Sequence, residues 1–299
     1  MRILPAVTGL LMLGLAFPMD MLADPAERSA GGSEIAVAKG SDFEFEFQHA
    51  GKAIHVFGYR PTGWKEGPLL VLFHGANRDA AGYRKSGREL AEKLGMLLVV
   101  PEFDRARFDP EAYQEGGVFL KKKQQPLEDR TFSYLAPLLV EMNRREGREL
   151  PYYLVGHSAG AQFICRMAAL HPNQAKRMVA VNPGSLVFPD RDQAYPHGFG
   201  GLEGDEASDE AIKRYLAVPL TLYLGTGDTG LQYLDTGEAA MKQGATRIER
   251  GRNAYAAAKK LAEERGWPFH WNLVEAEGLA HGCGPMWEPP RCREAILGR

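Results

Sequence analysis

The chain has 299 residues, of which 44% are hydrophobic and 25% are charged, and both fractions are ordinary for a globular protein. This length accommodates one large α/β domain or two small ones. The formal net charge is −2 and the sequence shows no clustered basic face, which argues against nucleic acid as the main partner.

The first residues of the chain, 1–23, have the pattern of a secretory signal peptide. Arg2 precedes a mostly apolar run over residues 3–17, which is short for a bilayer span but fits the core of a signal. We expect cleavage after Ala23, with Ala16 as the alternative, and hence an exported protein that is periplasmic or secreted.

The rest of the chain is expected to comprise a flexible segment and one domain. Residues 24–40 are rich in small and polar side chains, and residues 41–299 carry the periodic patterns of a folded domain. No internal repeat or linker divides this domain. No later apolar run has spanning length, so we expect no stable membrane insertion after signal cleavage.

Strand and helix patterns alternate through the middle of the chain. In chain order, strands are expected at 42–48, 53–59, 69–73, 96–100, 152–155, 178–181, 220–224 and 269–274. Helices are expected at 83–94, 132–145, 161–170, 209–215, 252–265 and 291–297. Pro101 is expected to end the fourth strand, and the segments 102–129 and 185–206 lack periodicity. This alternation predicts an α/β fold in which helices cover both faces of a mostly parallel central sheet.

The strand expected at 152–155 is followed by Gly156-His157-Ser158-Ala159-Gly160 and then by a helix. In a G-x-S-x-G turn between a strand and a helix, the serine occupies a strained conformation that lifts its hydroxyl above the sheet. Flanking glycines are needed because side chains there would collide with the neighbouring backbone. Ser158 is therefore our candidate nucleophile. The alternative is an ordinary strand–helix turn, since so short a pattern also occurs by chance.

A serine nucleophile needs a base and an acid that orients the base. His281 follows the last expected strand in a glycine-containing loop and is the candidate base; the alternative is a surface histidine. Asp228, in Gly-Thr-Gly-Asp after the strand at 220–224, is the candidate acid, although the same residues favour a simple turn. Asp235 and Glu206 are held in reserve.

The oxyanion of such a reaction needs fixed hydrogen-bond donors. The amide of Ala159 directly follows the candidate nucleophile, and the amide of Ala76 lies in the His74-Gly75-Ala76 turn after the strand at 69–73. All four loops with candidate residues follow the carboxyl ends of predicted strands, where functional loops of parallel sheets gather. His74 and His157 are expected to fix their turns by hydrogen bonding.

The three cysteines show no zinc-site spacing. Cys283 and Cys292 lie close in sequence near the C-terminus, and they could pair in an oxidising compartment or stay free. Cys165 follows Ser158 on the same helix and is expected to be a buried small hydrophobe.

The Gly156–Gly160 motif, the His74-Gly75-Ala76 loop, Asp228 and His281 together resemble the α/β-hydrolase fold family. The leader and the oxyanion loop are similar to those of exported bacterial esterases of the polyhydroxybutyrate-depolymerase and feruloyl-esterase type. The resemblance implies a serine–acid–histidine triad, no metal and no cofactor. Because the segment 185–206 is too short for a large helical cap, we expect a short cap or none, and an open cleft lined by aromatic residues of that segment and of 108–119.

These observations favour an exported carboxylesterase-like serine hydrolase that forms an acyl-enzyme on Ser158 and acts on a small-molecule or polymeric ester. A serine peptidase or amidase with the same triad is the second hypothesis, because the triad does not choose the acyl group. A non-catalytic binding protein on a hydrolase scaffold is the third.

Overall fold

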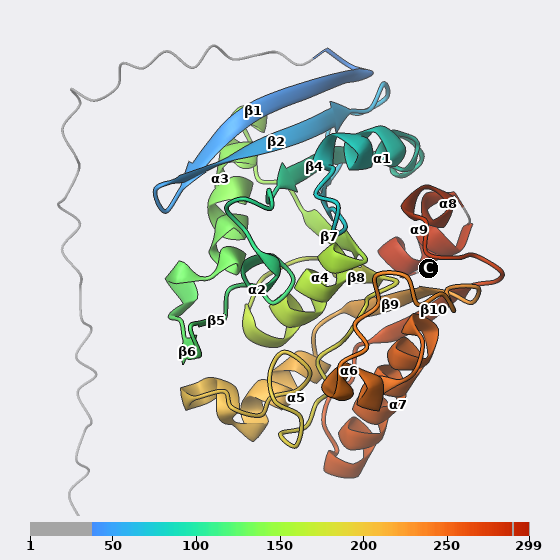
Figure 1. Cartoon of the computed structure of the whole chain (residues 1–299). Helices are drawn as coiled ribbons and strands as arrows, with labels where there is room; N and C mark the ends of the chain where they lie inside the picture. Colours follow the sequence, from blue (N-terminus) through green and yellow to red (C-terminus); the bar gives the residue numbers. More distant parts are fainter. Residues whose placement is uncertain (1–37, 289, 299) are drawn as a thin grey trace, which may run out of the picture. The chain divides into compact units, whose positions relative to one another are not determined.

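An eight-stranded sheet runs through the part of the chain that the computed structural model describes, residues 38–288 and 290–298 (Figure 1). In spatial order its strands are β1 (Ser41–His49), β2 (Lys52–Arg60), β4 (Leu97–Glu102), β3 (Leu69–Phe73), β7 (Tyr152–His157), β8 (Arg177–Val181), β9 (Leu220–Gly225) and β10 (Asn272–Ala276). β2 pairs antiparallel with β1 and with β4, and the other pairs are parallel. The mostly parallel sheet expected from the sequence is confirmed, whereas the predicted signal peptide lies outside the described residues.

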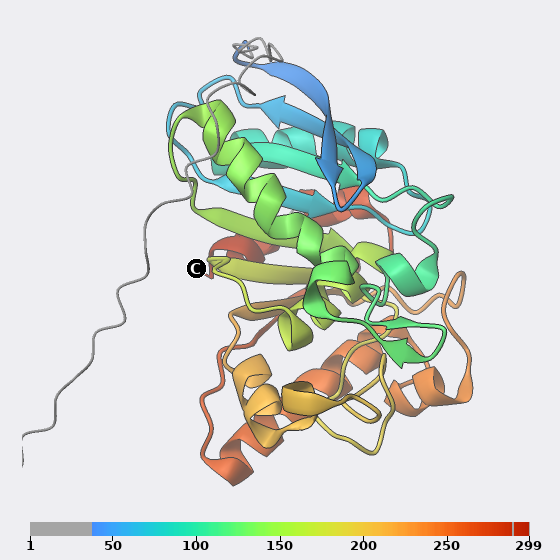
Figure 2. The same ribbon diagram turned by 90° about the vertical axis from the view of Figure 1, so that its left-hand side faces the viewer.

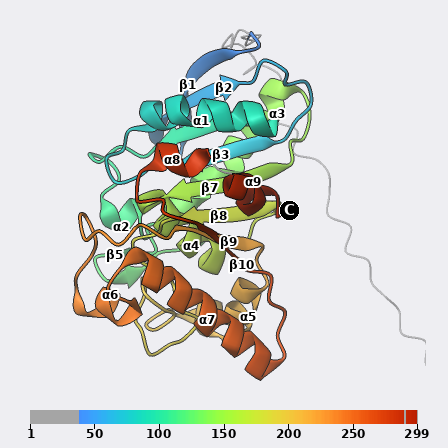
Figure 3. The ribbon, with the colours of Figure 1, turned by 90° about the vertical axis from the view of Figure 1, so that its right-hand side faces the viewer.

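Side chains of β3 alternate between two hydrophobic cores, one on each face of the sheet. Leu69, Val71 and Phe73 belong to the first core, and Leu70 and Leu72 to the second. The first core is covered by α3 (Leu135–Glu146), α4 (Ala159–Leu170), α5 (Asp209–Leu216) and α7 (Arg247–Arg265), and Figure 2 looks onto α3. The second is covered by α1 (Ala80–Leu94), α8 (Cys283–Trp287) and α9 (Pro290–Leu297), which Figure 3 shows in front of the strands. Helices on both faces are thus confirmed.

Several short elements were not expected from periodicity. They are α2 (Pro110–Tyr113), β5 (Phe119–Leu120), β6 (Lys123–Gln124), α6 (Glu238–Gln243), α8 and the 3-10 turns η2 (Leu127–Asp129) and η4 (Gly204–Ala207). Elements of fewer than two turns, or of one residue pair, are too short to show a period. The helix expected at 132–145 begins as the 3-10 turn η3 (Thr131–Tyr134) and continues as α3. Between β8 and β9 the chain contains only η4 and α5, which agrees with a short cap or none.

Pro101 does not end β4, which continues to Glu102. Pro101 pairs with Val56 of β2, whereas the pairing of β4 with β3 reaches only Val99. Beyond Val99 one edge of β4 therefore has no strand partner, and a residue without an N–H group is tolerated there.

The last strand begins at Asn272 rather than at Phe269, because the preceding residues are bound to α5 instead of β9. The indole N–H of Trp271 donates to the backbone oxygen of Tyr215 over 3.0 Å, and the His270 amide donates to Leu216 over 2.9 Å. These bonds tie the chain to the end of the helix before it enters the sheet.

The carboxyl ends of β3, β7, β9 and β10 meet at one edge of the sheet. Phe73 is paired with Gly156 of β7, and Gly225 of β9 with Ala276 of β10. The loops that follow these strands therefore converge. Within the described residues, no helix combines the length and apolar character that a membrane span requires.

Candidate active site

Ser158 lies at the sharp turn between β7 and α4. Its φ of 56° and ψ of −112° are unusual for a residue with a side chain and cost on the order of 1–3 kcal/mol. The conformation is held by the Ser158 amide, which donates to Val181 of β8 over 2.9 Å. A Cβ atom at Gly156 would lie 2.2 Å from the Gly160 carbonyl oxygen, and one at Gly160 would lie 2.3 Å from that of Phe73. Both positions of the motif thus require glycine for a steric reason.

The structure brings Ser158, His281 and Asp228 into one line of hydrogen bonds. His281 Nδ1 lies 2.7 Å from Asp228 Oδ2, and His281 Nε2 lies 3.0 Å from Ser158 Oγ. Because a carboxylate only accepts, Nδ1 carries the proton of a neutral imidazole and Nε2 is left to accept from the serine hydroxyl. Asp228 is 2% exposed, so its charge acts in a largely water-excluded environment.

The loops after β9 and β10 hold each other in place. The Gly227 amide donates to Leu279 over 2.9 Å, and the hydroxyl of Thr226 accepts from the Gly278 amide over 2.8 Å. These bonds fix the loop of Asp228 against the loop of His281. The relative positions of the two side chains are therefore set by contacts between their loops.

The reserve acids lie elsewhere. Glu206 forms a bidentate pair with the buried Arg130, with distances of 2.6 and 3.0 Å. The Asp235 carboxylate accepts from the Gly237 amide over 2.8 Å. In the described part of the chain, neither contacts His281.

His157, inside the motif, connects three parts of the site. Its Nε2 donates to the backbone oxygen of His281 over 2.6 Å, and its Nδ1 accepts from the Tyr83 hydroxyl of α1, also over 2.6 Å. Burial, with a smaller contribution from the neighbouring His281, lowers the pKa of His157 to about 3. His157 is therefore neutral at ordinary pH and suited to bracing the His281 loop.

The loop after β3 places the backbone of Ala76 beside the site. His74 Nδ1 donates to Gly75 O over 3.1 Å and its Nε2 accepts from the Phe103 amide over 3.0 Å. Arg105 donates to the Ala76 carbonyl over 2.7 Å. Ala159 is the first residue of α4, where backbone amides have no acceptor within the helix. The backbone of Ala76, which lines the same cavity as Ser158, and that of Ala159, the next residue along the chain, thus both lie beside Ser158.

A cavity of about 660 Å³ opens beside Ser158 and His281. Its other walls come from the loops after β3, β4 and β9 and from the start of α8. They include Ala76, Asn77, Arg105, Gly230, Gln232, Tyr233 and Cys283. The expectation of a cleft lined by aromatics of 108–119 and 185–206 was wrong. Phe108, Tyr113 and Phe199 are at most 2% exposed, because they pack into the first core.

Arg247, the first residue of α7, was missed by the sequence analysis. Its guanidinium lies 3.3 Å from Asp228 Oδ1 and is 3% exposed. The first turn of a helix is unfavourable for a cation, because the helix dipole is positive there. An arginine at a predicted helix start is therefore a signal for a tertiary acidic partner. The sequence analysis placed this start five residues later, at Arg252, and so it did not recognise Arg247 as a first-turn residue.

The cysteines are unbridged in the structure. Cys292 is 1% exposed within the second core, whereas Cys283 is half-buried at the wall of the cavity. Cys165 is fully buried, as expected. Across residues 38–288 and 290–298, no cluster of three or more His, Cys, Asp or Glu side chains is arranged to hold a metal ion.

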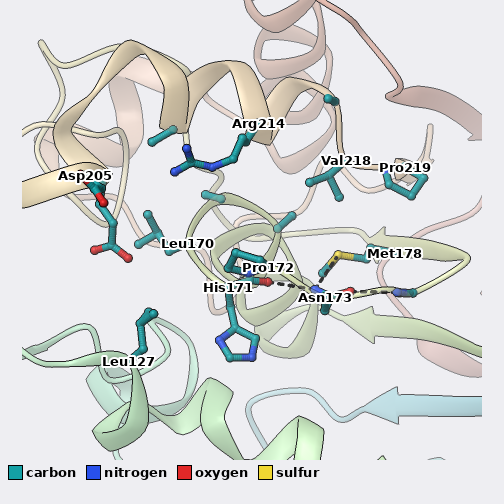
Figure 4. Close-up of a pocket in the computed structure, with 16 residues that line it drawn as sticks. Leu127, Leu170, His171, Pro172, Asn173, Met178, Asp205, Arg214, Val218 and Pro219 are labelled. Atoms are coloured by element: carbon teal, nitrogen blue, oxygen red, sulfur yellow. Dashed lines mark hydrogen bonds between the residues drawn. The ribbon is translucent and has the colours of Figure 1, made fainter. Parts of the chain in front are cut away.

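A second cavity, of about 400 Å³, lies at the far end of α4 (Figure 4). Leu170, His171, Arg214 and Pro219 are among its lining residues, and none of the lining residues carries a hydroxyl or thiol nucleophile. Ser158 precedes the opposite end of the same helix. Ser158, Asp228 and His281 thus line the first cavity and not the second.

No protein-family model and no curated protein matches the sequence. Solved structures do match. Poly(aspartic acid) hydrolase-1 from Sphingomonas sp. KT-1 is 32% identical over 83% of this chain and 96% of its own, with a TM-score of 0.78. The poly(3-hydroxybutyrate) depolymerase LpqC from Bordetella parapertussis is 28% identical over 89% and 93%, with a TM-score of 0.81. A ferulic acid esterase shares the fold at 13% identity, over 86% and 97%, with a TM-score of 0.50.

Proposed function

The chain belongs to the α/β-hydrolase family, and from this premise we propose that it is an exported serine hydrolase that cleaves carboxylic esters through an acyl-enzyme on Ser158. The broader assignment, a hydrolase, is supported by the names of two similar structures. The neighbour at 32% identity is named a hydrolase and the neighbour at 28% identity a depolymerase. The observation that carries the finer proposal is the 3.0 Å separation between Ser158 Oγ and His281 Nε2.

In the first step, Ser158 Oγ attacks the carbonyl carbon of the ester while His281 Nε2 takes the hydroxyl proton. The imidazolium that forms is stabilised by Asp228, whose Oδ2 accepts from Nδ1 over 2.7 Å. The carbonyl oxygen becomes an oxyanion, for which the amides of Ala159 and Ala76 are the proposed donors. Losing one such donor costs about 3 kcal/mol of transition-state stabilisation.

Collapse of the tetrahedral intermediate breaks the bond to the alcohol, and His281 Nε2 returns the proton to the leaving oxygen. Ser158 then carries the acyl group. A water molecule, deprotonated by His281, attacks this acyl-enzyme and releases the carboxylic acid. The 660 Å³ cavity beside Ser158 is large enough for a small-molecule substrate or for one end of a polymer chain.

A peptidase or amidase is the second candidate, and one observation favours it. The neighbour that is 32% identical is named for poly(aspartic acid), whose backbone consists of amide bonds, whereas the neighbour at 28% is named for a polyester. The triad serves either reaction. Ester cleavage remains the first choice, because an ester carbonyl is less stabilised by resonance than an amide carbonyl and is attacked more readily by the serine.

Covalent labelling tests the mechanism directly. Purified protein beginning at Asp24 is treated with a fluorophosphonate probe beside the Ser158→Ala variant. We expect label on the wild type alone; a wild type without label, or a variant labelled equally, contradicts the acyl-enzyme and favours a non-catalytic binding protein.

Paired chromogenic substrates test the bond class. p-Nitrophenyl esters and p-nitroanilides of the same acyl group are compared by kcat/KM, with the Ser158→Ala variant as the blank. Faster ester turnover supports the proposal, and faster anilide turnover favours the amidase.

Export is tested separately from activity. The full chain is expressed in a Gram-negative bacterium, and the periplasmic and secreted fractions are analysed by N-terminal sequencing. An N-terminus at Asp24 supports cleavage after Ala23, one at Phe17 supports the alternative, and uncleaved protein in the cytoplasm contradicts export.

A further inference from the structure

Arg247 faces the oxygen of Asp228 that His281 does not use. We infer that Arg247 is a positioning residue that keeps His281 available as a neutral base, by compensating the charge of Asp228, and that anchors one wall of the substrate cavity. This role rests on the proposed function of Ser158, His281 and Asp228.

The contacts form one continuous line through the site. Ser158 Oγ is 3.0 Å from His281 Nε2, His281 Nδ1 is 2.7 Å from Asp228 Oδ2, and Asp228 Oδ1 is 3.3 Å from Arg247 Nη1. Within the described residues, His281 and Arg247 are the two polar partners of the Asp228 carboxylate. The carboxylate and the guanidinium are 2% and 3% exposed.

A buried carboxylate needs a compensating charge. In the resting enzyme His281 has to be neutral to accept the serine proton, so it supplies no positive charge. Arg247 is then the only cation in contact with Asp228 in the described part of the chain. Without it, the unbalanced carboxylate would hold a proton on the imidazole more strongly, and the base would be occupied before the serine could use it.

The same guanidinium also ties down the loop after Asp228. Nη1 donates to the Gly230 carbonyl over 2.9 Å and Nη2 donates to the Gln232 carbonyl over 2.6 Å. Gly230, Gln232 and the neighbouring Tyr233 line the cavity beside Ser158. One side chain therefore sets both the charge balance of the acid and the position of a wall that the substrate meets.

Other ionisable groups also face His281, and the experiment has to separate them from Arg247. The rings of His157 and His281 are 4.9 Å apart, and His157 is neutral because of its lowered pKa. Asp79, Tyr83, Arg105 and Cys283 line the same cavity. All of these side chains are still present when Arg247 is substituted.

Arg250 provides a matched control one turn further along α7. It is fully buried and donates to the backbone oxygens of Gly244, Gly184 and Asp235 over 2.7–2.9 Å. Within the described residues it forms no hydrogen bond or ion pair with Asp228 or His281, although it is as deeply buried as Arg247. A general loss of packing should lower the stability of Arg247 and Arg250 variants alike. Loss of charge compensation at Asp228 should change the pH profile of the Arg247 variants only.

The test measures the pH dependence of kcat/KM on a p-nitrophenyl ester, and of the rate of fluorophosphonate labelling, for the wild type, Arg247→Met, Arg247→Lys and Arg250→Lys. For Arg247→Met we expect the acid limb to move about one unit towards higher pH, so that kcat/KM on that limb falls about tenfold. Arg247→Lys retains the charge but not the paired contacts, and we expect KM to rise while the acid limb stays in place. Arg250→Lys should lower the melting temperature without moving the acid limb.

A second comparison uses the Asp228→Asn background. There no carboxylate charge remains to compensate, so adding Arg247→Met should leave the acid limb of the labelling rate unmoved.

The inference is overturned if the acid limb of the pH profile lies at the same pH in Arg247→Met and in the wild type. It is also overturned if Arg250→Lys shifts the acid limb as far as Arg247→Met does. If Arg247→Met does not fold, displacement of the limb in Arg247→Lys, which keeps the charge, overturns it equally. Failure of the proposed function is distinguishable, because the wild type itself would then take no Ser158-dependent label.

Discussion

His157 Nε2 donates to the backbone oxygen of His281 over 2.6 Å, so the residue before the candidate nucleophile holds the loop of the candidate base. Replacing His157 by Ala removes this bond and leaves the Tyr83 hydroxyl without its acceptor. We expect kcat for ester hydrolysis to fall about 100-fold with little change in KM, because small misplacements of catalytic groups are costly. His171→Ala, in the second cavity, is the control and should retain kcat. Equal kcat values for the two variants would contradict the bracing role.

Acidification should destabilise the protein through its buried neutral histidines. Burial lowers the pKa of His157 to about 3 and of His74 to about 4, from 6.5. Between these values and pH 6.5 the unfolded chain binds protons that the folded chain does not, so stability falls as the pH falls through this window. At pH 5 the loss is on the order of 2 kcal/mol for each histidine.

Urea unfolding of the wild type at pH 7.5 and pH 5 measures this loss. His74→Asn should unfold with a smaller difference between the two pH values. Identical differences for the variant and the wild type would show that His74 makes no such contribution.

Because Ser158 has a positive φ, replacing it by glycine should stabilise the fold. Glycine adopts such a conformation without the side-chain penalty, so Ser158→Gly should raise the free energy of unfolding by about 1 kcal/mol while abolishing activity. Ser158→Ala keeps the Cβ atom and should give little or none of the gain. Chemical denaturation of both variants checks the prediction, and equal stabilities would argue against strain at this turn.

Because Gly156 lies close to α4, adding a methyl group there should lower the free energy of unfolding. A Cβ atom there would meet the Gly160 carbonyl at 2.2 Å, so Gly156→Ala should destabilise the protein by about 3 kcal/mol through displacement of the turn. Gly63→Ala is the control, since nothing lies within 4 Å of its added Cβ atom. Thermal unfolding of the two variants should show a much lower melting temperature for Gly156→Ala alone.

Much of the architecture followed from local patterns. Buried strands such as β3 are continuous apolar runs with the same bounds in sequence and structure, and the turn of Ser158 is fixed by glycines on either side. Because parallel strands end at one edge, the order of the loops already indicated that Ser158, Asp228 and His281 could meet. The α/β-hydrolase resemblance rested on those same residues and is confirmed by the neighbours at 32% and 28% identity.

Other features depend on contacts between residues far apart in the chain. The sequence did not reveal that Arg247 faces Asp228, that His157 reaches the His281 backbone, or that Phe108 packs into the core rather than lining a cleft. Propensity and periodicity act over a few neighbouring residues, so they determine strands, turns and the residues that terminate them. The packing of separate elements, which excludes water, decides which buried charges pair with each other. It also decides which aromatic rings are covered.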